Sequence, residues 1–294
     1  CIRDRVFKLG RDDVTAALKE HYKGKILLPK SFVTGNHIDE VQGVYVPFWL
    51  YGARVDGEVY FDATNETVTE ESDRTVTTTD HYDAYRKGNI SFKRVPVDGS
   101  SKMPDGHMDA IEPFDYDALR PFSVAYMPGY IANRYDEDCE TCKARAERRM
   151  EESTISALRE TVVDEYDDAT VENKQLDYTW EESDYALFPV WMLSTSWNGK
   201  SYLFAMNGQT GRMVGELPCS KPKLAIASVL FFVIGFVLSQ ILFMGENAFD
   251  PDYLAFDVEG ILINIVAPLI IVIIADVLLV GQLKTANEAT HADC

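Results

Sequence analysis

The 294-residue sequence predicts an α+β fold made of two copies of a helix followed by a β-hairpin and antiparallel strands, with a transmembrane helical hairpin at the C-terminus. The first observation is an internal repeat: "YVPFWLYGARVDGEVYFDA" (45–63) returns without a gap as "LFPVWMLSTSWNGKSYLFA" (187–205). The second is a helical pattern before each copy, and the third is a pair of long apolar runs near the C-terminus. Self-similarity of this kind indicates a duplicated unit.

A helix is predicted before each copy of the repeat. The first, "RDDVTAALKEHY" (11–22), has an acidic first turn and apolar side chains at four-residue spacing. The second is predicted over 142–166. Its apolar stripe comprises Met150, Ile155, Leu158 and Val162.

Each copy also predicts a hairpin. Asp56-Gly57 and Asn198-Gly199 are the dipeptides that a two-residue type I′ turn favours, because both central residues need positive φ. Alternating stretches rich in Thr, Val and Tyr follow the first hairpin, so we expect several more antiparallel strands there. The two helix-and-hairpin units, about 7–97 and 123–217, would form one domain over 1–220, in which each half covers the other.

The repeated aromatic side chains have two interpretations. Trp49, Tyr60, Trp191 and Tyr202 occupy matching positions in the two copies. Aromatic residues in strands most often belong to the core, which would explain why the unit is duplicated. The alternative is that these four residues line a ligand groove between the halves.

The C-terminal quarter predicts a membrane anchor. The run 224–244 has no charge and is long enough to cross about 30 Å of hydrocarbon as a helix, and 261–280 is predicted to cross back despite Asp276. An acidic loop (245–260) and a tail (281–294) complete this region. Asp276 would either pack between helices or reach the membrane interface from near a helix end. The alternative is that it handles an ion or proton.

The charges near the apolar runs predict the orientation. Lys221 and Lys223 precede the first run and Lys284 follows the second, while the loop between them lacks Lys and Arg. We therefore expect the domain and both termini to be cytoplasmic and the loop to lie outside. Five cysteines, an odd number, also suggest a reducing compartment. Cys1, without an initiator Met, suggests a cut in a longer chain.

The formal net charge of −19 argues against nucleic acid as a partner. The basic run "KARAERR" (143–149) is predicted to be a solvated helix face, with a local anion or lipid-headgroup contact as the alternative. The acidic segment 103–122 is predicted to be an exposed connector. The alternative is Ca²⁺ binding through Asp105, Asp109 and Asp115, although their spacing does not match an EF-hand loop.

Cys139 and Cys142 form the one cysteine pair with spacing suited to metal or redox chemistry. A structural zinc site needs four ligands, and no second pair is present. One alternative is therefore an incidental pair, and another is a metal shared with ligands outside this sequence. The third alternative is a redox pair, because a helix start beside Lys143 would lower a thiol pKa. The five histidines are scattered, and no nucleophile elbow, phosphate loop or dinucleotide motif appears, so we expect no enzymatic activity and no cofactor in this chain.

Four stretches carry a resemblance to a known family. They are "LKEHYKGKILLPKSF", "NHIDEVQGVYVPFWLYGA", "MDAIEPFDYDALRPFSVAYMPGYIANRYD" and "FAMNGQTGRMVGELP". Over residues 7–225 the chain resembles bacterial membrane proteins, common in Firmicutes and Actinobacteria, that carry N-terminal zinc ribbons. The resemblance implies architecture and topology but no reaction. The ribbon cysteines would lie upstream of Cys1, so zinc is implied only for the full-length protein.

These observations predict a membrane-anchored cytoplasmic scaffold or adaptor. Its expected partners are the lipid bilayer and other membrane or membrane-associated proteins. The alternative is a sensor that binds a small molecule or peptide between the two halves.

Overall fold

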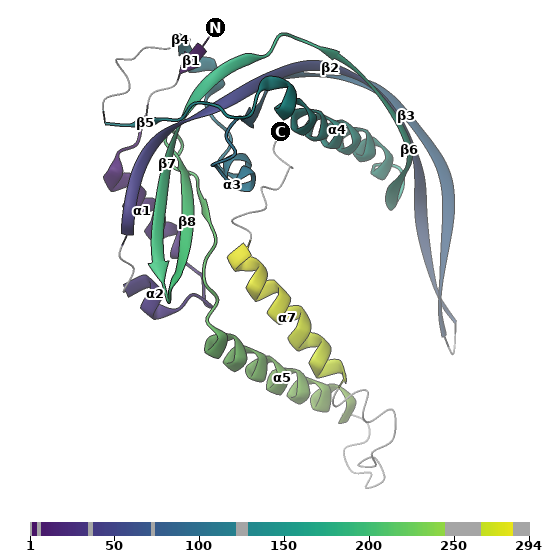
Figure 1. Ribbon diagram of the computed structural model, residues 1–294. Coiled ribbons are helices and arrows are strands. Elements are labelled where there is room, and N and C mark those ends of the chain that lie inside the picture. Colours follow the sequence, from purple (N-terminus) through teal and green to yellow (C-terminus); the bar gives the residue numbers. More distant parts are fainter. Residues whose placement is uncertain are drawn as a thin grey trace.

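The computed structural model describes residues 2–4, 7–34, 38–71, 74–121, 129–244 and 266–284. They form an α+β fold with a largely antiparallel sheet, from which two apolar helices extend (Figure 1). The helices are α1 (Arg11–Tyr22), α2 (Lys30–Thr34), α3 (Asp105–Ala110), α4 (Cys139–Val163), α5 (Lys221–Met244) and α7 (Ala267–Lys284). The strands are β1 (Ile2–Asp4), β2 (Ile38–Glu71), β3 (Arg74–Asp98), β4 (Arg120–Pro121), β5 (Ile131–Ala132), β6 (Asp168–Trp180), β7 (Asp184–Trp197), β8 (Lys200–Asn207) and β9 (Met213–Gly215).

The two copies of the repeat pair with each other in the middle of the sheet. Val46, the second residue of the first copy, lies opposite Phe188, the second residue of the other copy. The flanking pairs are Tyr45 with Pro189 and Pro47 with Leu187. Because matching residues meet in an antiparallel pair, a local two-fold axis passes through the Val46–Phe188 pair.

The same symmetry relates the backbone around the two copies. The Gly99 amide donates to the Pro47 carbonyl, and the Gly208 amide donates to the matching Pro189 carbonyl, both at 2.9 Å. A short parallel strand lies beside each copy, β5 against β2 and β1 against β7. The duplication in the sequence is therefore a duplication of three-dimensional structure.

The repeated tryptophans show what each half does for the other. The Trp49 indole Nε1 donates to the Glu137 carbonyl (3.1 Å), two residues before α4. The Trp191 indole Nε1 donates to the Leu9 carbonyl (3.0 Å), two residues before α1. Each copy of the repeat thus binds the chain just before the helix that belongs to the other half.

Both predicted helices are confirmed, but the bounds of the second differ from its prediction. The helix predicted over 11–22 is α1, with the same bounds. The helix predicted over 142–166 begins at Cys139 and ends three residues early. Its start lies earlier because the Asp138 carboxylate caps the helix by accepting a hydrogen bond from the Thr141 amide (2.8 Å).

The two turn predictions have different outcomes. Asn198 and Gly199 have φ values of 51° and 74° and connect β7 to β8, so the hairpin of the second copy is confirmed. The turn predicted at Asp56-Gly57 is wrong, because β2 continues through both residues and pairs with β3 far beyond them.

Close approach of α4 explains the glycine in the first copy. Gly57 lies opposite Gly88 of β3 and Leu176 of β6, in extended backbone. A Cβ atom on Gly57 would lie 3.2 Å from the Thr154 side chain, and one on Gly88 would lie 3.2 Å from Leu158, both on α4. The glycine pair lets the helix approach the sheet, and pairing on both sides of β2 overrides the local turn preference.

We call the part of the sheet formed by residues 53–71, 74–92 and 168–180 the arm. It curves around α4, which lies along its concave face (Figure 1). Val59 and Phe61 of β2 and Val162 of α4 are fully buried between the two layers. The arm thus has one face covered by a helix and one convex face open to solvent.

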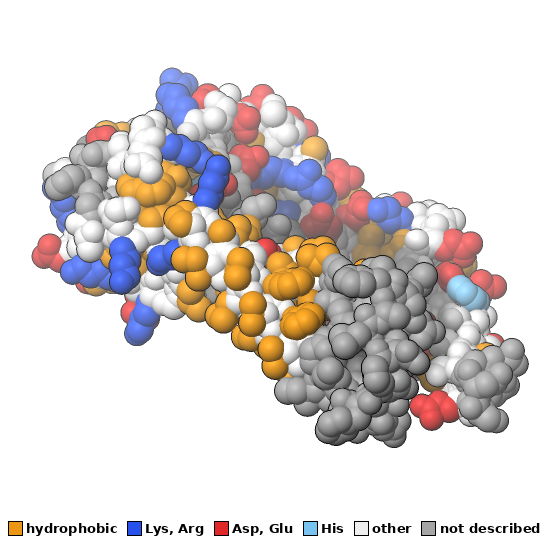
Figure 2. Space-filling model, turned by 90° about the horizontal axis from the view of Figure 1, so that it is seen from below, with side chains coloured by type: hydrophobic (Ala, Val, Ile, Leu, Met, Phe, Trp, Pro, Cys, Tyr) orange, Lys and Arg blue, Asp and Glu red, His pale blue; other side chains and the backbone are white. Residues whose placement is uncertain are grey.

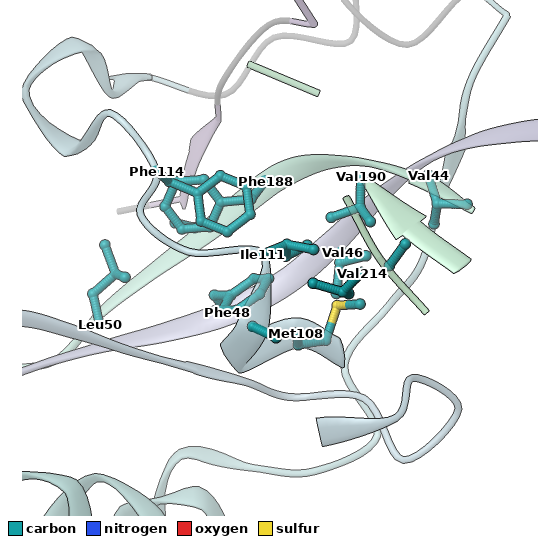
Figure 3. Packing of buried hydrophobic residues seen from close by; sticks show 13 residues of the cluster. Val44, Val46, Phe48, Leu50, Met108, Ile111, Phe114, Phe188, Val190 and Val214 are labelled. Atoms are coloured by element: carbon teal, nitrogen blue, oxygen red, sulfur yellow. The ribbon is translucent and has the colours of Figure 1, made fainter. Parts of the chain in front are cut away.

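The segment 103–122 differs from its prediction as an exposed connector. Met108, Ile111 and Phe114 are buried in the central core cluster, where the rings of Phe114 and Phe188 stack at 4.4 Å (Figure 3). The apolar residues between its acids fix the segment against the sheet, and only part of its charge reaches solvent.

Candidate functional site

Buried charge concentrates where α4 meets α3 and the end of β3. The Arg145 guanidinium lies 2.8 Å from both the Asp98 and the Asp109 carboxylates and 3.0 Å from Asp105. The Arg145 side chain is 13% exposed, and that of Asp98 is fully buried. The acids suggested as Ca²⁺ ligands therefore include two that already bind an arginine.

Arg149 makes a second set of contacts one helical turn later. It binds Glu112 through two hydrogen bonds of 3.0 and 2.8 Å, and it also donates to the Pro96 carbonyl. Burial raises the pKa of Glu112, and Arg149 opposes that rise. Arg145 and Arg149 are largely buried, so the prediction of a solvated basic face is wrong for both, because the acidic segment folds over them.

We call the ion pairs of Arg145 and Arg149 with Asp98, Asp105, Asp109 and Glu112 the ionic cluster. Three buried polar atoms, two in this cluster and one in Ser100 beside it in the chain, have no hydrogen-bond partner among the described residues. They are Asp98 Oδ2, Ser100 Oγ and Arg145 Nε. Burial raises the pKa of Asp98 to about 6, although Arg145 acts to lower it. The charge of the Asp98 carboxylate is therefore disfavoured by burial and favoured by the Arg145 guanidinium beside it.

The matching position in the second half carries an amide. Asn207, like Asp98, directly precedes a symmetric glycine and is fully buried. Its Nδ2 donates to the carbonyls of Ile111 (2.9 Å) and Pro113 (3.0 Å), and its Oδ1 accepts from the Gln209 amide (2.9 Å). The two halves thus satisfy one buried position in different ways, by charge in one and by neutral hydrogen bonds in the other.

The cysteine pair lies in the first turn of α4, beside the ionic cluster. Burial, together with Glu137 and Asp98, raises the pKa of Cys142 to about 12. The expectation that the helix start would lower this thiol pKa is therefore wrong for Cys142. Lys143 lies over the Trp180 ring at 4.9 Å. Among the residues that the structure describes, no group of three or more His, Cys, Asp or Glu has a geometry that could hold a metal ion.

The four aromatic residues proposed for a groove lie in different surroundings. Trp191 and Tyr202 are buried in one core cluster, 7% and 8% exposed. Trp49 packs at the edge of another cluster, against the rings of Tyr135 and Tyr185. Tyr60 lies on the convex face of the arm and is 46% exposed.

Tyr60 has an exposed partner across the strand. Its ring lies 4.9 Å from that of Tyr85, which is 44% exposed. The two residues are opposite each other in the β2–β3 pairing. Two large aromatic side chains therefore lie together in solvent on the open face of the arm.

The helices α5 and α7 expose a broad apolar surface (Figure 2). Ile226 and Val229 of α5 are 70% and 65% exposed, and Val277 of α7 is 66% exposed. One helix among the described residues is long and apolar enough to cross a membrane, with its window at Lys221–Leu238. The apolar part of α7, Pro268–Gly281, is shorter. The loop 245–260 and the start of the second predicted span lie outside the described residues.

A polar contact joins the two apolar helices. Ser228 Oγ of α5 donates to Asp276 Oδ2 of α7 at 2.7 Å, and Asp276 Oδ1 is buried without a partner among the described atoms. Nearby, Gly235 lies close to Pro268 and Ile271, so its missing side chain lets the backbones approach. Asp276 therefore takes part in helix packing.

The start of α5 is tied to the folded domain. Lys223 Nζ donates to the carbonyls of Ile26 (3.1 Å) and Leu28 (2.7 Å), and the Ser220 amide donates to the Leu27 carbonyl (2.9 Å). These bonds fix the helix to the loop between α1 and α2, so the domain and the apolar helices are joined by more than a linker.

Comparison with known proteins gives one relative. The chain is 34% identical over 219 residues to a protein described as "Uncharacterized protein YdjG" from Bacillus subtilis (strain 168), which is 74% of this chain and 64% of that protein. The chain thus spans less than two thirds of that relative's length. No family model matches the chain, and no solved structure matches it.

Proposed function

We propose that the chain is a membrane-anchored scaffold without enzymatic activity, which presents the arm to other membrane-associated proteins. The observation that carries this proposal is the arm itself: three long strands that extend past the shared core and keep exposed aromatic side chains on their open face. Exposed Tyr pairs are typical of surfaces where proteins bind each other. The same proposal includes a C-terminal helical hairpin as the membrane anchor and a cytoplasmic location for the domain.

The apolar helices support the anchor. Exposed apolar surface of this extent is unfavourable in water and favourable in hydrocarbon. Lys221 and Lys223 at the start of α5 suit a cytoplasmic interface, and Lys223 also binds the domain. We propose that residues 261–280, which include most of α7, form the returning span.

The alternative of a sensor between the halves has less support. The indole N–H groups of Trp49 and Trp191 already donate to backbone carbonyls, so neither is free to bind a ligand.

Cysteine labelling tests the anchor. In a variant without the native cysteines, an impermeant reagent on intact cells should label single cysteines placed at 246–259 but not one near residue 100. The reverse labelling would contradict the proposed orientation, and release of the chain by alkaline carbonate would contradict the anchor.

Affinity purification from gently solubilised membranes tests the scaffold. We expect proteins that co-purify with the wild-type chain to be lost with a Tyr60→Ser/Tyr85→Ser variant. They should be kept with Arg54→Ala, the matched control on the same convex face. An unchanged set in both variants would contradict use of the arm.

A further inference from the structure

The outer edge of β3 is open along the arm. β3 is 25 residues long, and among the described residues it pairs with β2 and with no other strand. Such an edge presents unpaired N–H and C=O groups to solvent, and natural proteins normally keep edge strands short or cover them. An added strand would satisfy those groups.

Three alternate residues of β3 share the convex face of the arm. Asp83, Tyr85 and Lys87 lie opposite Asp62, Tyr60 and Glu58 of β2. The residues between them, Ala84 and Arg86, face the other way and contact the α4 layer. The convex face of the β3 edge therefore carries an acid, an aromatic residue and a base in turn, namely Asp83, Tyr85 and Lys87.

The acid in this row has no counter-charge. Asp83 lies opposite Asp62, and like charges in that position destabilise a strand pair. The His81 ring nitrogen lies 2.9 Å from Asp62, whereas Asp83 has no ion pair or hydrogen bond from its side chain among the described residues. Lys87, in contrast, is paired with Glu58. The open edge therefore lacks a cation beside Asp83.

We propose that a second copy of this chain supplies it, with the β3 edges of two copies pairing antiparallel about Tyr85. In that register Asp83 of each copy lies opposite Lys87 of the other, so each acid gains a cation that it shares with Glu58 of the other copy. Tyr85 lies opposite itself, and the Tyr60–Tyr85 pair of each copy joins into one row of four rings. The interface is the same on both copies, as a two-fold dimer requires.

Charge order along β3 favours a second copy over an unrelated strand. The first half of β3 carries Arg74, Asp80 and Asp83, and the second carries Arg86, Lys87, Lys93, Arg94 and Asp98, so the net charge is negative in the first half and positive in the second. Antiparallel pairing of two such strands places the acidic half of one against the basic half of the other. This inference deepens the proposed scaffold and rests on it only in using the same arm, because dimerisation does not require the membrane anchor.

Disulfide formation tests the register. The full chain in detergent micelles would carry Tyr85→Cys, with Gln175→Cys as matched control on the same face but on the β6 edge. Directly opposite residues in antiparallel strands lie about 4.5 to 5.5 Å apart between Cα atoms, within disulfide reach. We expect Tyr85→Cys to form a covalent dimer much faster than the control and the wild-type chain. Equal rates would overturn the proposed register.

Charge reversal tests the pairing without a new bond. Asp83→Lys alone or Lys87→Asp alone should weaken the dimer about tenfold, because each turns two attractive contacts into two repulsive ones. Mixing the two variants should restore dimers, since each contact across the interface then joins Lys to Asp again. Mass photometry or sedimentation measures both.

Asp83→Lys supplies the folding control, because Lys87→Asp also loses the ion pair with Glu58 within the chain. Asp83→Lys places a cation opposite Asp62, so it should keep or raise the melting temperature while it weakens the dimer. A monomeric wild-type chain at tens of micromolar, or no recovery on mixing, would overturn the proposal. A monomer that still retains its co-purified proteins would leave the scaffold standing and reject only the second copy.

Discussion

The two copies of the repeat have the same structure around their tryptophans and different structures around their turn dipeptides. Trp49 and Trp191 make matching hydrogen bonds to the entry of the opposite helix. Asn198-Gly199 forms a turn, while Asp56-Gly57 lies inside a continuous strand. The same class of dipeptide therefore forms a turn in the second copy, where the strands have few neighbours. In the first copy it stays extended, because partner strands pair with β2 beyond it.

Packing decides between these outcomes. A Cβ atom at Gly199 would meet no heavy atom within 4 Å, and the residue has a φ of 74°, so glycine is needed there for backbone conformation. Gly57 is crowded by Leu176 and Thr154, so glycine is needed there for space. One duplicated unit has thus produced a compact hairpin and a long presenting arm.

The greatest loss of stability is expected from truncating the repeated tryptophans. Trp191→Ala should destabilise the fold by about 3 to 5 kcal/mol, the range for large aromatic core deletions. Trp49→Ala should cost less, about 2 kcal/mol, since Trp49 is only half-buried. Denaturant unfolding of the full chain in micelles measures both. An equal or larger loss at Trp49 would contradict this difference between the halves.

The buried polar positions come next. The pKa of Asp98 is raised by burial, so its contribution to stability is present below pH 4 and is lost as pH rises towards about 6. The loss should be about 3 kcal/mol, and Asp98→Asn should flatten it. Asn207→Asp should add a slope of the same sign, because a carboxylate there would face the carbonyls of Ile111 and Pro113.

Unfolding measured from pH 4 to 7 checks this pair. The control is Asp136→Asn, an exposed acid whose pKa is lowered, mainly by the Ser101 amide. The contribution of such an acid is complete above about pH 4, so this variant should leave the slope between about pH 4 and 7 unchanged. A wild-type curve that is unchanged by Asp98→Asn would contradict the role assigned to the cluster.

The two glycines should give the mildest losses. Gly57→Ala should cost about 1 to 3 kcal/mol by overpacking, and Gly199→Ala about 1 kcal/mol by backbone strain. Adding Thr154→Ser removes the methyl group that crowds Gly57 and should rescue part of the first loss only. Unfolding in denaturant measures these changes. Rescue of both variants, or of neither, would show that the glycines are not distinguished by space.

The sequence alone predicts the duplication, the helices and the α+β class, because repeated letters and apolar spacing report local structure. It does not predict the arm, since turn preference at Asp56-Gly57 is local and the competing strand pairs are distant in the chain. The Gly57–Gly88 contact with α4 is visible only after folding.

The ionic cluster was accessible in part from the sequence. Arg145 and Arg149 lie four residues apart, on one face of a helix, and Asp105, Asp109 and Glu112 follow a matching spacing. What the spacing does not show is that the acidic segment also carries buried apolar residues, which draw it over the arginines.

A disulfide across the arm tests whether the first copy continues through its turn dipeptide, on which the contrast between the two halves depends. Thr67 and Thr78 lie opposite each other near the tip, so Thr67→Cys/Thr78→Cys should close an intramolecular disulfide, detected by peptide mass spectrometry. A turn at Asp56-Gly57 would instead bring Ala53 and Tyr60 together, as Thr195 and Tyr202 are in the second copy. Closure at 67 and 78 is the predicted result. Closure of Ala53→Cys/Tyr60→Cys, with 67 and 78 left reduced, would contradict it.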